Sequence, residues 1–206
     1  ARQHALRHRQ LRNGMVAIFC YVGAEVAIGS LIIGFLELKG VMGLEHNAAK
    51  NYLSLYWGGA MCGRFLGAVA LSDRFRGVKR LALMLGIGAA LFLLLGFINQ
   101  FSGGLHLNHL WPLALLITAN MAVFVLAGRH TGKVTGLFAG VAGALVLFTM
   151  FSGGATAMWA ILAVGLFNSI LWSNIFTLSI HALGTDTGQG FYQMMKELPQ
   201  ERLVIA

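Results

Sequence analysis

The sequence has 206 residues, of which 57% are hydrophobic and only 11% are charged. Ordinary soluble domains carry roughly 25% charged residues, so this chain has too few to cover a soluble surface. In a soluble protein the net charge of +8 would suggest a nucleic-acid partner. Here the basic residues stand in short stretches between apolar runs, which indicates membrane topology and argues against nucleic acid.

Six apolar segments are long enough, or nearly so, to cross the hydrocarbon core, which takes about 20 helical residues. In chain order they cover residues 14–36, 48–71, 81–98, 110–127, 134–151 and 155–183. We therefore expect an all-α polytopic bundle of about six transmembrane helices over residues 14–184. A basic arm over residues 1–13 and a polar tail over residues 185–206 are expected to lie in the cytoplasm.

Lysine and arginine are concentrated at one side of the predicted bundle. Twelve of the fifteen stand in four regions, which are the arm, the loop 73–80, the turn 129–133 and the tail. Cytoplasmic segments carry such an excess. The pattern predicts a multi-pass protein of the inner cell membrane with both termini inside.

Glycines recur at a spacing of four in two of the segments. Gly59, Gly63 and Gly67 follow this spacing in the second segment, and Gly136 and Gly140 in the fifth. Small residues at this spacing let helix backbones approach closely in lipid. Both stripes therefore predict helix packing.

Glu25 stands about half-way along the first segment, with Tyr21 one turn before it on the same face. A charged side chain at this depth costs at least about 2.5–3.5 kcal/mol and usually faces the bundle interior or a wet cavity. The carboxylate could bind a proton or a sugar. It could also be a neutral, hydrogen-bonded structural group.

Asn168 and Trp172 share a face of the sixth segment and form a second candidate site, whereas Asn174 points elsewhere. An amide bonds hydroxyl groups and an indole stacks on the C–H face of a sugar. The alternative is hydrogen bonding between helices, at about 0.6 kcal/mol per contact. Tyr56, in the second segment, is deep enough to reach a central cavity.

A charged cluster follows the second segment. Arg64 could extend to the inner surface, or pair with Asp73 or with a helix C-terminus. Asp73 and Arg74 open a loop of the kind that latches neighbouring helices by charge. Topology alone would also explain these residues.

No catalytic motif stands out, so we expect neither an enzyme nor a cofactor. His106 and His109 have a spacing that suits a metal, but two histidines without carboxylates predict a solvated loop and no metal site.

Three stretches resemble helices of one transporter family. FCYVGAEVAIGS at 19–30 resembles the seventh helix of the fucose/glucose–galactose permease branch of the major facilitator superfamily. SLYWGGAMCGRF at 54–65 resembles its eighth helix, and GLFNSILWSNIFTL at 165–178 a later helix of the same half. The motifs occur in the family's order and the resemblance covers about residues 11 to 190.

This resemblance implies monosaccharide:cation symport by alternating access, with a sugar of the fucose, glucose or galactose type and a proton or sodium as the coupling ion. It implies that one wall of the site is formed by Tyr21, Glu25, Tyr56, Asn168, Trp172 and Asn174. It also implies a partner, the N-terminal half that this chain lacks.

Two departures from the family pattern concern the extent of the chain. The region 105–151 adds membrane-spanning material, and the two closing helices of the family are absent after the turn 184–190. We therefore expect a fragment of a sugar transporter that is not competent alone. The alternative is a non-transporting remnant or a helix-packing protein.

Overall fold

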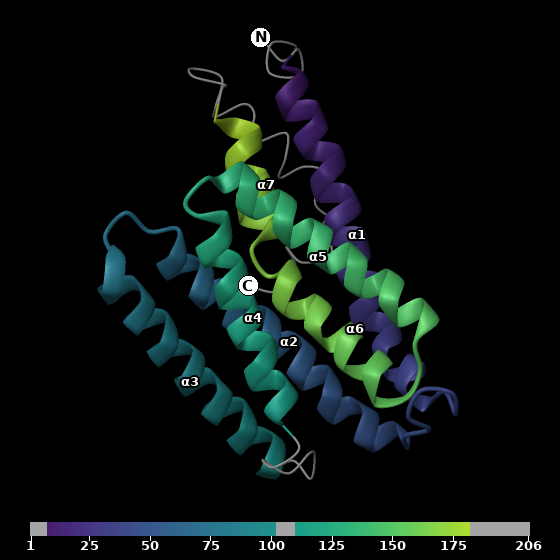
Figure 1. Cartoon of the computed structure of the whole chain (residues 1–206). Coiled ribbons are helices and arrows are strands. Elements are labelled where there is room, and N and C mark those ends of the chain that lie inside the picture. The colour runs from purple at the N-terminus through teal and green to yellow at the C-terminus, as the bar shows by residue number, and fades with distance from the viewer. Residues whose placement is uncertain (1–7, 102–109, 182–206) are drawn as a thin grey trace, which may run out of the picture. The chain divides into compact units, whose positions relative to one another are not determined.

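The computed structural model describes residues 8–101 and 110–181, and every regular element in these ranges is a helix. The first residues of the expected arm, the whole expected tail, His106 and His109 lie outside the described residues. The predicted all-α bundle is confirmed. Figure 1 shows its helices, which are α1 (Arg9–Glu37), α2 (His46–Ala70), α3 (Gly77–Phe101), α4 (Trp111–Ala127), α5 (Thr131–Phe151), α6 (Gly154–Asn168) and α7 (Leu171–Ile180).

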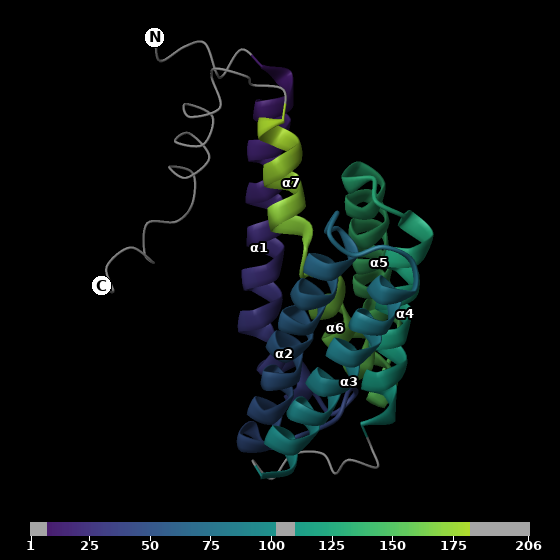
Figure 2. The ribbon, with the colours of Figure 1, turned by 90° about the vertical axis from the view of Figure 1, so that its left-hand side faces the viewer.

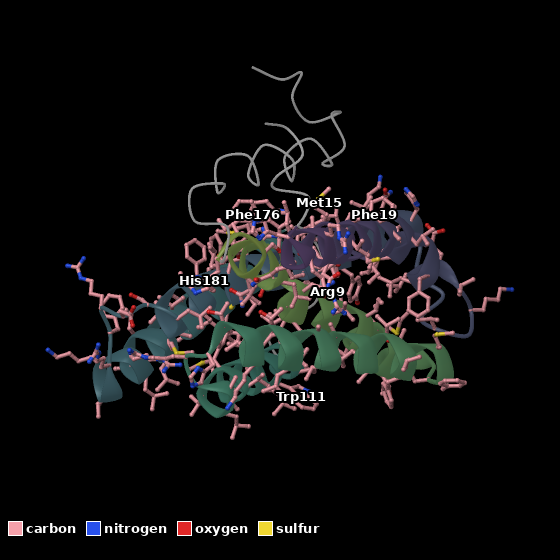
Figure 3. The ribbon with its side chains drawn as sticks, turned by 90° about the horizontal axis from the view of Figure 1, so that it is seen from above. Arg9, Met15, Phe19, Trp111, Phe176 and His181 are labelled. Atoms are coloured by element: carbon pink, nitrogen blue, oxygen red, sulfur yellow. The ribbon has the colours of Figure 1, made fainter. Side chains whose placement is uncertain are left out.

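Four stretches of the described chain are long and apolar enough to cross a membrane, by length and composition. They are Arg9–Glu37, Gly77–Phe101, Thr131–Phe151 and Gly154–Ile180. The apolar helix α4 is shorter, with 17 residues, and its exposed Trp111 stands at its start (Figure 3). The 25-residue α2 includes the charged Lys50 and Arg64.

The sixth expected segment differs from a single continuous helix. It is divided after Asn168, where α6 ends, and α7 begins at Leu171. Near this point the carbonyl groups of Leu166 and Ser169 accept hydrogen bonds from side chains of other helices. Side chains that bond into the helical ladder are a known cause of such interruptions.

The chain divides into two compact units, and unit 1 consists of α1 up to Val26 with α7 from Trp172 onward. These two helical stretches run side by side (Figures 2 and 3). Gln10 Nε2 donates to the Leu178 carbonyl at 2.6 Å, and a Cβ atom at Gly14 would meet the Ser179 side chain. The apolar core between them comprises Leu11, Met15, Ile18, Val22, Ile175, Phe176 and Ile180.

Unit 2 comprises residues 27–171, and α6 is its most buried helix. Every residue of α6 from 160 onward is buried, because α2, α4 and α5 all pack against it. The turn after α4 contains Gly128 at φ +70°, a left-handed conformation that favours glycine and ends the helix.

The glycine stripe of α2 lies against α6, as expected from its spacing. A Cβ atom at Gly63 would stand 2.6 Å from the Leu166 carbonyl oxygen, and one at Gly67 would stand 2.5 Å from Ile170 Cγ2. Close packing is thus confirmed for α2. For α5 the prediction is wrong within the described chain, since nothing lies within 4 Å of a Cβ atom at Gly136 or Gly140.

Candidate functional site

Unit 1 contains four of the six residues expected to bind substrate or proton. Tyr21 and Glu25 follow each other by one turn on α1, which places them on one face. Tyr21 is buried, and Glu25 is half-buried. A carboxylate on an apolar helix is rare, and such a residue usually faces the interior of a bundle or a wet cavity.

The other two residues of unit 1 lie on α7. Trp172 is partly exposed and stacks on Phe176, with ring centroids 5.4 Å apart and planes inclined by 7°. Asn174 is buried, and its Nδ2 atom has no hydrogen-bond partner among the described residues. The stacked rings offer a flat aromatic surface, and the amide offers an available donor, which are the two groups that bind a sugar.

Tyr56 and Asn168 both belong to unit 2, on α2 and α6. Tyr56 is fully buried, and its ring and carbonyl group lie against Gly165, three residues before Asn168. Trp57 meets Tyr56 edge to face at a centroid distance of 5.3 Å. Asn168 is buried as the last residue of α6. Helix packing therefore brings these two predicted residues to neighbouring turns.

Arg64 lies beside the end of α6. Its Nε atom donates to the Ser169 carbonyl oxygen at 3.2 Å. A cation at a helix C-terminus is favourable, because the last carbonyl groups carry partial negative charge. A helix C-terminus was one of the partners considered for Arg64 from the sequence, and this contact is present.

Asp73 and Arg74 lie in the loop between α2 and α3. Asp73 Oδ1 accepts from Arg129 Nη1 at 3.4 Å, and Arg129 Nη2 donates to the Phe75 carbonyl oxygen at 2.5 Å. The backbone N–H of Arg74 donates to Ser72 Oγ at 3.2 Å. Arg129 thus ties this loop to the turn between α4 and α5.

Two residues that make contacts near the candidate site, Arg129 and Asn120, are not among the site residues predicted from the sequence. Arg129 was visible only as part of a basic turn, and Asn120 only as an isolated amide in an apolar helix. Asn120 Nδ2 donates to the Leu166 carbonyl oxygen at 3.3 Å. Neither partner could be found from sequence spacing, because both contacts join residues more than 40 positions apart.

The largely apolar groove between α1, α5 and α6 is a poor sugar site. Its volume is about 240 Å³, and the residues that line it include Leu31, Phe35 and Met150. The hydroxyl group of Thr149, which also lines it, already donates to the Leu145 carbonyl oxygen. Among the described residues, no cluster of three or more His, Cys, Asp or Glu side chains could hold a metal ion.

Known proteins similar to this chain are bacterial sugar transporters. A glucose/galactose transporter of Brucella abortus biovar 1 (strain 9-941) is 32% identical over 186 residues, which cover 90% of this chain. A putative glucose/galactose transporter of Helicobacter pylori (strain ATCC 700392 / 26695) is 29% identical over 86% of the chain. The L-fucose-proton symporter of Escherichia coli (strain K12) is 27% identical over 89%.

The chain is homologous to these sugar transporters. The resemblance to the fucose/glucose–galactose permease branch, stated above from three motifs, is therefore confirmed. With its apolar helices, the chain is a multi-pass membrane protein. These relatives are named as transporters, and none as an enzyme.

The matches have a limited extent. The chain spans about a third of the length of its curated relatives, with shares of 32%, 30% and 29%. No protein-family profile matches the sequence, and no solved structure is similar enough to match.

Proposed function

We propose that this chain forms one wall of a monosaccharide:cation symport site that works by alternating access. The observation that carries the proposal is the similarity to sugar transporters along nine-tenths of the chain. The proposed binding residues are Tyr21, Glu25, Tyr56, Asn168, Trp172 and Asn174. The substrate class is a monosaccharide of the fucose, glucose or galactose type, after the names of the relatives.

In this proposal Glu25 carries the coupling proton. A carboxylic acid on an apolar helix is neutral when protonated, so it can cross between conformations without the cost of a buried charge. Sodium remains the other candidate coupling ion. Trp172 would stack on the sugar ring, and the amides of Asn168 and Asn174 would bond its hydroxyl groups.

The proposed gating elements are Arg64, Asp73 and Arg74. The support is that Arg129 joins the loop of Asp73 to the next cytoplasmic turn, through bonds that a movement of either segment would break. We propose the inner membrane as the location, with both termini in the cytoplasm, because the basic loops would then all face inward.

The test is sugar uptake by cells that lack their own transporter for that sugar. In secondary transporters built from repeats, the site lies at the repeat interface near the midplane. We therefore expect little accumulation with this chain alone, and pH-dependent accumulation of galactose, glucose or fucose when the remaining part of a relative is co-expressed. Absence of sugar binding and uptake in both arrangements, despite membrane insertion, would overturn the proposal.

The matched variants are Glu25→Gln and Glu37→Gln, which change two acids of the same helix. Glu25→Gln is expected to abolish accumulation against a gradient, because an amide cannot take up the proton. Glu37 lies at the end of α1, where its Oε1 pairs with His46 Nδ1 at 2.6 Å, so its change should leave accumulation intact. Unchanged, pH-dependent accumulation in Glu25→Gln would exclude the coupling role.

One observation favours the alternative function, a non-transporting membrane protein that acts by helix packing. The glycines of α5 at positions 132, 136 and 140 form a stripe with open space beside it within the described chain. Stripes of this spacing support helix association in lipid. This alternative predicts no uptake with any complementing segment, and association with another membrane protein that is lost in Gly136→Leu.

A further inference from the structure

The end of α6 is held by side chains from two other helices of unit 2. Asn120 on α4 donates to the Leu166 carbonyl oxygen, and Arg64 on α2 donates to that of Ser169. These carbonyl groups flank Asn168, two residues before it and one after it. Because the last four carbonyl groups of a helix lack intrahelical donors, side chains that reach them help to fix where the helix ends.

The burial of Asn120 is energetically unfavourable. It is fully buried, in the middle of an apolar helix of 17 residues. A buried amide destabilises a protein unless it is hydrogen-bonded. The bond from Nδ2 to Leu166 offsets part of this cost, whereas Oδ1 has no partner among the described residues. Packing alone would be served better by leucine, so the amide itself calls for an explanation.

Aromatic contacts hold the same turn of α6. Phe124, one turn after Asn120 on α4, lies with its ring centroid 4.5 Å from that of Phe138 on α5. Phe138 in turn lies 5.6 Å from Phe167 on α6. These rings connect α4, through α5, to the residue between Leu166 and Asn168. Two independent sets of contacts therefore fix this turn from α4.

We propose that Asn120 is a positioning residue for Asn168: by bonding the Leu166 carbonyl group, it fixes the last turn of α6 and the direction of the Asn168 amide. Arg64 acts on the following turn in the same way. The inference rests on the proposed sugar site, to which Asn168 belongs. The inference assigns α4 a role in substrate binding. This helix belongs to the region 105–151, in which the sequence departs from the family pattern.

The first test does not depend on sugar. Backbone hydrogen exchange is measured for residues 164–172 of the full chain in lipid nanodiscs. Asn120→Leu keeps the branched shape of the side chain and removes the donor, so exchange in this segment should rise about three- to tenfold, as expected for one lost buried hydrogen bond. Thr118→Val is the matched control, because the Thr118 hydroxyl group donates only within its own helix, to Ala114. Unchanged exchange in Asn120→Leu would overturn the bracing role.

The second test measures equilibrium binding of radiolabelled galactose, glucose and fucose, with the chain alone and with the complementing segment of a relative. Asn120→Leu should weaken binding about three- to tenfold, if the loss of one hydrogen bond is transmitted to the site. Thr118→Val should bind like the wild type. Increased exchange with unchanged sugar affinity would overturn the positioning role. If the wild type binds no sugar, the proposed function fails and the positioning role with it, whereas the exchange data still decide the bracing role.

Two further variants guard against misfolding of Asn120→Leu. Asn120→Asp has the same shape, and its protonated form can still donate to Leu166. The ratio of its exchange rate to that of the wild type at the same pH should therefore be near one at low pH and should increase as the pH rises. Arg64→Met keeps a long, unbranched side chain at an exposed position and removes the Nε donor, so it should raise exchange at residues 168–172. A ratio of Asn120→Asp to wild-type exchange that does not change with pH, together with wild-type exchange in Arg64→Met, would contradict the inference.

Discussion

The glycine stripes of α2 and α5 have the same spacing and opposite surroundings. Along α2, Gly59 and Gly63 lie against Leu166 of α6, and Gly67 lies against Ile170, just after the end of α6. A side chain at Gly63 or Gly67 would collide with these neighbours. Along α5, Gly136 and Gly140 face open space within the described chain. The spacing therefore indicates that a helix can be approached closely, but it does not tell whether another helix of the same chain approaches it.

The largest effect is expected at Gly63. In Gly63→Ala, the new methyl group would stand 2.6 Å from the Leu166 carbonyl oxygen and would also collide with Ser169 Oγ. The carbonyl group belongs to the backbone of a buried helix and cannot move alone, so we expect destabilisation by about 1–3 kcal/mol. Reversible unfolding in mixed micelles with increasing SDS measures this change. A stability equal to the wild type would contradict the packing described for α2 and α6.

A gradient along the stripe sharpens the comparison. Gly67→Ala should cost about 1 kcal/mol, at the lower end of overpacking costs, because the atom it meets is the terminal Ile170 Cγ2. Gly59→Ala should leave stability unchanged or raise it by up to about 1 kcal/mol, since its nearest neighbour, Leu166 Cβ, is at an ordinary 3.7 Å and alanine is the better helix former. The same unfolding experiment ranks the three positions. A different rank order would show that α2 and α6 are not packed as described.

No destabilisation is expected on α5. Gly136→Ala meets no atom within 4 Å and replaces a weak helix former, so stability should be unchanged or rise by up to about 1 kcal/mol. Clear destabilisation of the purified chain would indicate that this stripe does contact something, for example a second copy, and would remove the contrast between the two helices.

Much of the fold could be predicted from the sequence, because hydrophobic length is a local property. The apolar runs correspond to helices, and the spacing of the glycines in α2 predicts that another helix packs closely against them. The division of the sixth segment could not be predicted, because it depends on donors from Asn120 and Arg64, which lie about 50 and 100 residues away. No local signal at Asn168 or Ser169 requires the helix to end there.

The candidate site shows the same limit. Glu25 stands out because a carboxylate in an apolar helix is rare. Arg129 does not stand out, because a basic residue in a turn between two apolar helices is ordinary, and its bonds to Asp73 and Phe75 depend on how two turns meet. A residue whose type is unusual for its segment, such as a carboxylate in an apolar helix, can be found from the sequence. A residue whose type is ordinary for its segment, and which acts through a partner far away in the sequence, can be identified only from the structure.

The burial of α6 has a consequence for how the protein is made. Its neighbours in unit 2, α2, α4 and α5, all precede it in the chain, so each leaves the ribosome before α6 does. Until α6 arrives, the glycines of α2 and the amide of Asn120 have no partner from it and face lipid or the insertion machinery. The last helix of unit 2 to be synthesised is thus the one that fills its interior. A ribosome stalled before residue 154 would leave a membrane intermediate in which the surfaces of α2, α4 and α5 that pack against α6, including the Asn120 amide, are uncovered.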